Sequence, residues 1–155
     1  MQRRSFLKST LAGSAIAVAV GAGLLQPRMV LAAAWPKSAF KAKTAQDAMS
    51  SLYGSAASMP SSEITIKAPD IAENGAVVPV AIHTTLSNVT NIGIIAEKNP
   101  LPMSANFEMA PNAKGYVSTR IKMAKTSSII AIVVAGGKTY SARKEVKVTI
   151  GGCGG

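Results

Sequence analysis

The stretch that decides the fold is "SIIAIVVAGGKTYSARKEVKVTI", residues 128–150. Its first part, "SIIAIVVA" (128–135), is almost entirely apolar, which is typical of a central strand covered on both faces. The Gly136-Gly137 pair that follows is a hairpin signal. Beyond it, "EVKVTI" alternates apolar with polar residues, and this period of two indicates a second strand. The stretch therefore predicts an antiparallel hairpin inside a β-sheet, with Ile150 as its last anchored residue.

Five further runs of the same texture precede this hairpin and are separated by Gly, Pro or Asn. They are "SEITIKA" (62–68), "AVVPVAIHTT" (76–85), "TNIGIIAE" (90–97), "SANFEMA" (104–110) and "GYVSTRIKMA" (115–124). Seven short strands at roughly 8–12 residue spacing predict an all-β protein, an immunoglobulin-like antiparallel sandwich around one hydrophobic core. The likeness is architectural, because the Cys, Trp and Cys spacing of antibody domains is absent.

Three segments carry other local signals. Residues 39–54 place apolar side chains near helical spacing and predict one short amphipathic helix, with Gly54 as its C-cap. "EKNPLPM" (97–103) contains Pro100 and Pro102 and is expected to be a loop. Pro79 interrupts a strand pattern, which indicates an edge strand or a bulge at that point.

The first 34 residues have the pattern of a bacterial export signal. "RRSFLK" carries the twin-arginine pair Arg3 and Arg4, and a mildly apolar, Ala/Gly-rich run follows it. Small residues near 32–34 predict cleavage there, so that the mature domain spans 35–150. The alternative is a retained N-terminal anchor helix, although the apolar run is short for a membrane span. Twin-arginine signals are typical of proteins that are exported already folded.

The charge balance is basic. Removing the first 34 residues takes away Arg3, Arg4, Lys8 and Arg28, which lowers the formal net charge from +10 to +6. Nucleic acid is not expected as a partner, because no basic strand or helix is interleaved with aromatic residues. A solvated surface explains most of this charge, and attraction to small anions or acidic proteins is the other interpretation, in which Arg120 and Lys122 would steer acidic enzymes.

The only cysteine, Cys153, lies in "GGCGG" (151–155) directly after the predicted last strand. One cysteine cannot form an internal disulfide, so this thiol is either reactive or intermolecular. Glycines bury no side chain, and we therefore expect a mobile, slender arm that carries the sulfur roughly 10 Å from the body. No cation or histidine adjoins the thiol to activate it. The lone His83 is expected to be a surface residue, and no catalytic, metal or cofactor motif is present.

These segments together resemble the SoxY family of the bacterial thiosulfate-oxidising Sox system. The ending "KEVKVTIGGCGG", the twin-arginine leader, "IAENGAVVPV" (71–80), "AEKNP" (96–100) and "TRIKMAKTS" (119–127) are similar to family segments in the same order. The resemblance implies a periplasmic sulfur carrier and no enzyme, with no membrane attachment once the signal is removed. It implies Cys153 as the point of covalent attachment, and Gly151, Gly152, Gly154 and Gly155 as the swinging arm.

The resemblance also implies partners. A SoxZ-like β protein would form a heterodimer with this chain, and the pair would be exported together. A c-type cytochrome enzyme would conjugate thiosulfate to Cys153, a hydrolase would release sulfate, and a dehydrogenase would oxidise the remaining sulfane sulfur. The alternative function is a non-catalytic periplasmic sandwich that dimerises through Cys153. A permanent disulfide dimer without any sulfur adduct would favour that alternative.

Overall fold

The computed structural model describes residues 35–149. Two short helices precede nine strands: α2 (Lys37–Lys41), α3 (Ala45–Tyr53), β1 (Met59–Pro60), β2 (Ile64–Lys67), β3 (Ile71–Ala72), β4 (Val78–Thr84), β5 (Val89–Ala96), β6 (Met103–Glu108), β7 (Tyr116–Ile121), β8 (Ser127–Ala135) and β9 (Lys138–Val148). The predicted signal (1–34), Ile150 and the glycine arm (151–155) lie outside the described residues.

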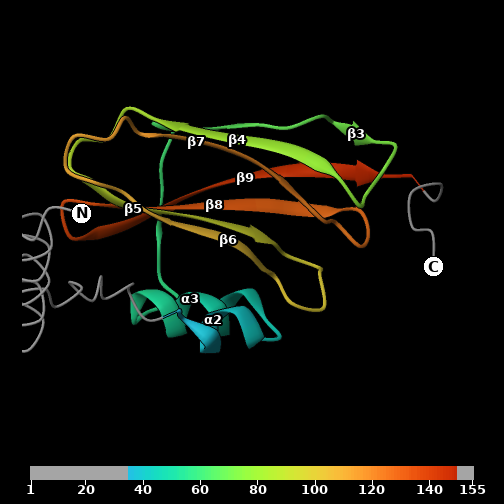
Figure 1. Ribbon diagram of the computed structural model, residues 1–155, viewed down its shortest axis with the longest axis horizontal. Coiled ribbons are helices and arrows are strands. Elements are labelled where there is room, and N and C mark those ends of the chain that lie inside the picture. Colours follow the sequence, from blue (N-terminus) through green and yellow to red (C-terminus); the bar gives the residue numbers. More distant parts are fainter. Residues whose placement is uncertain (1–34, 150–155) are drawn as a thin grey trace, which may run out of the picture. The chain divides into compact units, whose positions relative to one another are not determined.

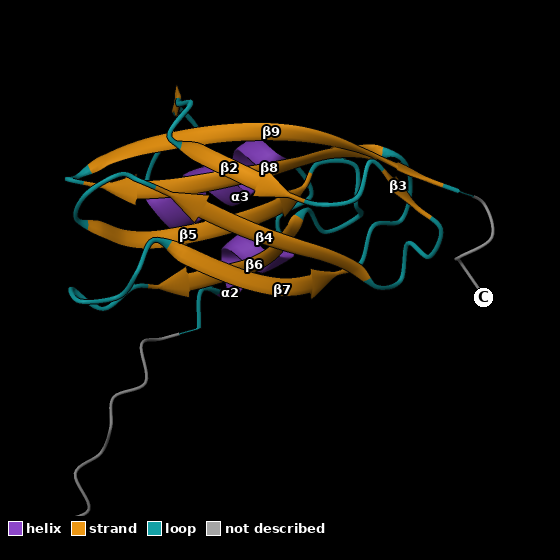
Figure 2. Cartoon of the chain, turned by 90° about the horizontal axis from the view of Figure 1, so that it is seen from above, coloured by secondary structure: helices purple, strands orange, loops and turns teal. Residues whose placement is uncertain are grey.

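The strands form two sheets that face each other (Figures 1 and 2). The larger sheet has the order β1-β9-β8-β5-β6, with β3 beside β9, and the smaller sheet has the order β2-β4-β7. This arrangement confirms the predicted all-β, immunoglobulin-like sandwich. The seven predicted strands are β2 and β4 to β9. The two-residue strands β1 and β3 were not predicted, and both pair with β9 in parallel.

Strand β8 lies between β9 and β5, as its apolar sequence predicts. Its alternate side chains enter two different cores. Ile129, Ala131 and Val133 lie in the core between the sheets, and Ile130 and Ile132 lie in a second core beneath the helices. The prediction of one core is therefore wrong, because helices α2 and α3 cover the outer face of the larger sheet (Figure 1). Because β8 is buried on both faces, its sequence does not alternate between apolar and polar residues.

The β8–β9 hairpin turns at Gly136 and Gly137, whose φ angles are 55° and 75°. Positive φ at both central residues is the geometry of a type I′ turn, which glycine adopts without strain. The prediction of an edge strand or a bulge at Pro79 is wrong, because β4 is the central strand of the smaller sheet and its pairing with β7 has no register shift. Pro79 is tolerated there because β2 pairs only with residues 81–84 of β4 and has ended before Pro79, whose partner is on β7.

The helical segment consists of two helices and not the single one that was predicted. Ala42, with φ −58° and ψ 143°, ends α2, and the chain restarts at Thr44. The Thr44 hydroxyl accepts a hydrogen bond from the Asp47 N–H at 3.0 Å, which caps α3. Gly54 ends α3 in the left-handed region, as predicted. Neither of the helices within residues 35–149 is long and apolar enough to cross a membrane.

Candidate functional site: the base of the C-terminal arm

The candidate carrier residue Cys153 and its four flanking glycines lie outside the described residues. The structure does describe how the chain leading to them is held. We call this region the arm base: the end of β9 up to Thr149, together with the three segments that contact it or brace it, residues 70–77, 97–102 and 122–126 (Figure 1). Sequence similarity singled out parts of these segments, and the fold brings them together.

Strand β3 holds one side of the arm base. Ile71 and Ala72 pair in parallel with Lys147 and Val148. The Lys147 N–H donates to the Asp70 carbonyl at 2.9 Å, and the Thr149 N–H donates to the Ala72 carbonyl at 3.1 Å. These backbone bonds continue to Thr149, the last described residue. The chain is therefore anchored up to two residues before Gly151, where the glycine-rich segment begins in the sequence.

The turn between β7 and β8 holds the other side through Thr126. Its Oγ1 accepts a hydrogen bond from the Val148 N–H at 2.9 Å and donates to the Val148 carbonyl at 3.4 Å. One hydroxyl therefore satisfies both backbone groups of Val148 past the end of the β8–β9 ladder, where no β8 residue remains opposite. Val148 is thus held by the β7–β8 turn, and Thr149 is held by the segment that contains β3.

Gly75 allows the close approach of three segments beneath the arm base. Its carbonyl accepts a hydrogen bond from the Met123 N–H at 2.7 Å. A Cβ at this position would lie 2.5 Å from the Met123 carbonyl oxygen and 2.7 Å from Val148 Cγ1. Only glycine fits such a site without displacing backbone, which gives the glycine of "IAENGAVVPV" a packing function.

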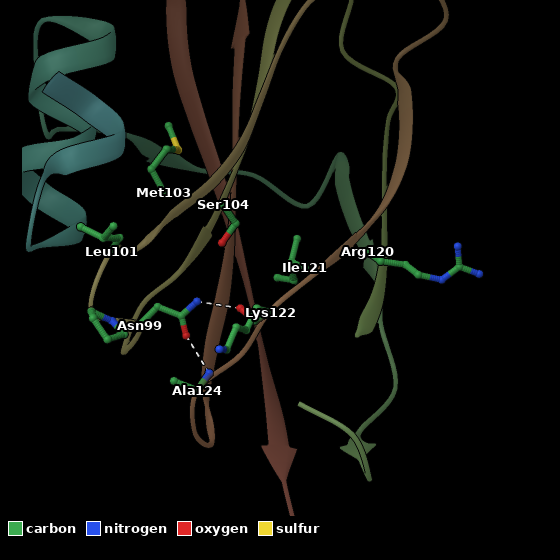
Figure 3. A pocket seen from close by; sticks show the side chains of 9 residues that line it. Asn99, Leu101, Met103, Ser104, Arg120, Ile121, Lys122 and Ala124 are labelled. Atoms are coloured by element: carbon green, nitrogen blue, oxygen red, sulfur yellow. Dashed lines mark hydrogen bonds between the residues drawn. The ribbon is translucent and has the colours of Figure 1, made fainter. Parts of the chain in front are cut away.

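Asn99 braces the arm base from the β5–β6 loop (Figure 3). Its Nδ2 donates to the Lys122 carbonyl at 2.6 Å, and its Oδ1 accepts from the Ala124 N–H at 2.9 Å. Two turns that are far apart in sequence are thereby fixed to each other. A pocket of about 430 Å³ opens beside this contact, and Leu101 and Met103 contribute to its lining.

The charged residues of the arm base are unevenly paired. Arg143 forms an ion pair with Glu97 at 2.9 Å, and Lys144 forms one with Asp70 at 3.0 Å. Exposed lysines remain on the two turns and on the end of β9, namely Lys98, Lys122, Lys125 and Lys147. The arm base is consequently a basic region of the surface.

The other residues singled out from the sequence lie elsewhere. His83 is exposed on β4, on the outer face of the smaller sheet, with Thr65 and Tyr116 as its cross-strand neighbours. Arg120, by contrast, lines the pocket beside Asn99, although its side chain extends away from Asn99 and Lys122 (Figure 3). Within residues 35–149, no group of three or more His, Cys, Asp or Glu side chains could hold a metal ion.

Thr126 and Asn99 are the residues that sequence reasoning missed. Each makes side-chain hydrogen bonds to backbone groups more than 20 positions away. Neither has a local signal, since both would read as ordinary polar loop residues. Their positions inside "TRIKMAKTS" and "AEKNP" were the only available indication.

Comparison with known proteins places the chain in a family. The sequence profile described as "Sulfur oxidation protein SoxY" matches residues 49–153. The solved sulfur carrier protein SoxY from Chlorobium limicola f thiosulfatophilum is 49% identical, with a TM-score of 0.61, and the match covers 67% of this chain and 94% of that one. No curated protein matches by sequence.

A second solved structure shows how widely the fold is shared. The superoxide reductase (neelaredoxin) from Ignicoccus hospitalis is 21% identical, with a TM-score of 0.50, over 56% of this chain and 80% of that one. At this identity the likeness concerns the sandwich alone. The match of the family profile over most of the chain, with the identity to the Chlorobium protein, is decisive: the chain belongs to the SoxY family of sulfur oxidation proteins.

Proposed function

We propose that this chain carries thiosulfate-derived sulfur covalently on Cys153 and presents it to separate oxidising and hydrolysing enzymes. Membership of the SoxY family supports a carrier of sulfur and not a catalyst. The observation that carries the proposal is the arm base: Thr149 is hydrogen-bonded to Ala72, and a single thiol follows between glycine pairs. A firm anchor and a chain without side chains are what a swinging arm requires.

The chemistry of loading is oxidative. The Cys153 thiol loses its proton, thiosulfate and the thiolate form an S–S bond, and an electron pair passes to a c-type cytochrome enzyme. The product is a thiosulfonate on Cys153. Water then cleaves the S–SO₃ bond in a hydrolase, which releases sulfate and leaves a persulfide. A dehydrogenase that takes oxygen from water and accepts the electrons would oxidise the remaining sulfane sulfur.

The arm supplies reach and no activation. The steps from Thr149 to Cys153 span at most about 14 Å of extended chain. Ordering the arm inside an enzyme costs about 1–2 kcal/mol per residue, which weakens each complex and favours release. Gly151, Gly152, Gly154 and Gly155 would form this arm, and their lack of side chains would let it enter a narrow channel.

The export and assembly of the chain belong to the same proposal. Residues 1–34 would direct the folded chain to the periplasm through the twin-arginine pathway and would then be removed. A SoxZ-like β protein would bind the sandwich before export. Family membership supports a place in the Sox system with partner proteins, and the twin-arginine pair in "RRSFLK" supports the route.

The test is the variant Cys153→Ser in the full chain, compared with Ser51→Ala as a control for substitution at an exposed site. Cells with Cys153→Ser should lose thiosulfate oxidation, and intact mass of the wild-type protein should show a thiosulfonate or persulfide adduct that is absent from the variant. Oxidation that persists in Cys153→Ser cells would overturn the proposal. A wild-type protein found only as a disulfide dimer without adducts would favour the non-catalytic dimer.

A further inference from the structure

We propose that the arm base is also a docking surface for enzymes whose active-site entrance carries a rim of carboxylates around an apolar recess. This inference rests on the proposed carrier function and adds the chemistry of the partner surface. Three independent features support it: the number of residues between Thr149 and Cys153 in the sequence and, among the described residues, the exposed apolar side chains and the lysines without an ion pair.

The tether determines which part of the body touches a partner. Cys153 is at most about 14 Å of chain from Thr149. A reactive centre that lies about as deep inside an enzyme as this tether is long brings that enzyme's surface against the residues around Thr149. The segments that meet there are β3 and the β7–β8 turn, which hydrogen-bond to the end of β9. Contact at the arm base is therefore a geometric consequence of delivery.

Exposed apolar side chains gather at this end of the sandwich. Ile71 is 57% exposed, Val77 51% and Leu101 45%, and they are half of the large exposed apolar residues within 35–149. Ile71 and Val77 lie on the 70–77 segment of the arm base, and Leu101 lies on the 97–102 segment. Val77 and Lys122 directly adjoin the paired residues Val78 and Ile121, and Lys122 and Leu101 border the same pocket. Clustered exposed apolar residues are typical of interaction sites.

The arm base also carries exposed lysines. Lys98, Lys122, Lys125 and Lys147 are all exposed. The carboxylates of Glu97 and Asp70 are already paired with Arg143 and Lys144, which leaves Glu73 and Glu145 as the other acidic residues on these segments and the end of β9. A partner that complements this pattern presents carboxylates at its rim, since complementary charge raises the rate of encounter.

The arm base is held rigid before a partner arrives. Asn99 fixes the β5–β6 loop to the β7–β8 turn through bonds of 2.6 and 2.9 Å. Gly75 lets the 73–77 turn pack directly on Met123 and Val148. A preorganised surface loses little conformational entropy on binding, which offsets part of the cost of ordering the arm.

The opposite end of the sandwich provides a matched control. Lys114 and Lys138 lie there, on the β6–β7 loop and at the start of β9, and both are exposed. Glu63 and Glu108, at the ends of β2 and β6, lie at the same end. A double reversal, Lys114→Glu with Lys138→Glu, therefore changes the net charge as much as Lys122→Glu with Lys125→Glu, but away from the tether.

The experiment measures kcat/KM for sulfate release from the thiosulfonate-loaded carrier, with the purified hydrolase of the same organism. At low ionic strength we expect the Lys122/Lys125 reversal to lower kcat/KM about tenfold or more and the Lys114/Lys138 reversal to lower it less than about twofold. The difference should shrink in high salt, where surface charges are screened. Equal losses for the two pairs, or no loss for either, would overturn the inference.

A second variant tests the apolar part. Leu101→Ser should lower kcat/KM at all salt concentrations, because it removes apolar contact area and no charge, whereas Met59→Ser, at another exposed apolar residue, should leave it unchanged. Equal kcat/KM values for the two variants would refute the part of the proposal that gives the partner an apolar recess. Every variant is first loaded and checked by intact mass. Failure to load any carrier through Cys153 would count against the carrier function itself, which separates the two hypotheses.

Discussion

Tyr53 and Gly93 form a close contact that should couple the effects of substitutions at the two positions. The Tyr53 hydroxyl, from the end of α3, lies within hydrogen-bond distance of Asn91 Oδ1 at 3.1 Å and of Asn106 Oδ1 at 3.2 Å. It rests on Gly93 in β5, where a Cβ would overlap the hydroxyl oxygen while ring carbon Cζ stays 3.4 Å away. The hydroxyl therefore fills the space that the missing side chain leaves.

We predict strong coupling between Gly93→Ala and Tyr53→Phe. Tyr53→Phe should lower the free energy of unfolding by about 1–2 kcal/mol, because a hydroxyl has one proton and donates one hydrogen bond at a time. Gly93→Ala should cost about 2–3 kcal/mol through overpacking. In the double variant the clashing atom is absent, so the total should be about 1–2 kcal/mol smaller than the sum of the single effects.

The assay is urea unfolding of residues 35–155 with all four members of the cycle, with Tyr116→Phe as a control because that tyrosine is 51% exposed. Costs that add to within about 0.5 kcal/mol would refute the overlap of hydroxyl and Cβ. A control variant that lost as much stability as Tyr53→Phe would refute the assignment of the energy to the buried hydroxyl.

The same tyrosine predicts a dependence on pH. Burial raises the pKa of Tyr53 well above its ordinary value near 10. The folded state disfavours the phenolate. The stability that the buried neutral hydroxyl contributes is therefore complete below pH 10, the ordinary pKa of tyrosine, and is lost as the pH rises beyond it. Tyr53→Phe should flatten the loss of stability between neutral and strongly alkaline pH. An unchanged alkaline profile in the variant would contradict the buried position of the hydroxyl.

Three shorter predictions concern the arm base and the helices. Thr126→Val should remove both side-chain hydrogen bonds to Val148 and lower the free energy of unfolding by about 1–2 kcal/mol. The Val148 amide should then exchange hydrogen faster, and unchanged exchange would argue against the role of Thr126 in holding Val148. Gly75→Ala should cost about 1–3 kcal/mol, because its Cβ meets backbone at Met123, and a neutral effect in thermal unfolding would contradict this packing. Thr44→Ala should cost about 1 kcal/mol by removing the cap of α3 while Thr44→Ser should not, and equal melting temperatures would count against the cap.

Local pattern was sufficient for most of the sandwich. Strands β4, β5, β7, β8 and β9 were predicted because alternation or a continuous apolar run is set by neighbours within a few residues. The Gly136-Gly137 turn and the Gly54 cap were predicted because positive φ selects glycine locally. The helical break at Ala42–Thr44 was missed, since the apolar spacing of residues 39–54 continues across it.

The sequence by itself determined that this is a β-sandwich with one thiol on a glycine-rich terminus, and the similarity of its motifs indicated the family. Only the tertiary structure decided what holds the arm. Strand β3 has two residues, which is too few for a periodic signal in the sequence. It is a strand because its backbone pairs with β9. Thr126, Gly75 and Asn99 act on residues brought near by the whole fold. Their roles depend on contacts between segments that are far apart in the sequence. The pattern of residues along the chain does not show which distant segments come into contact.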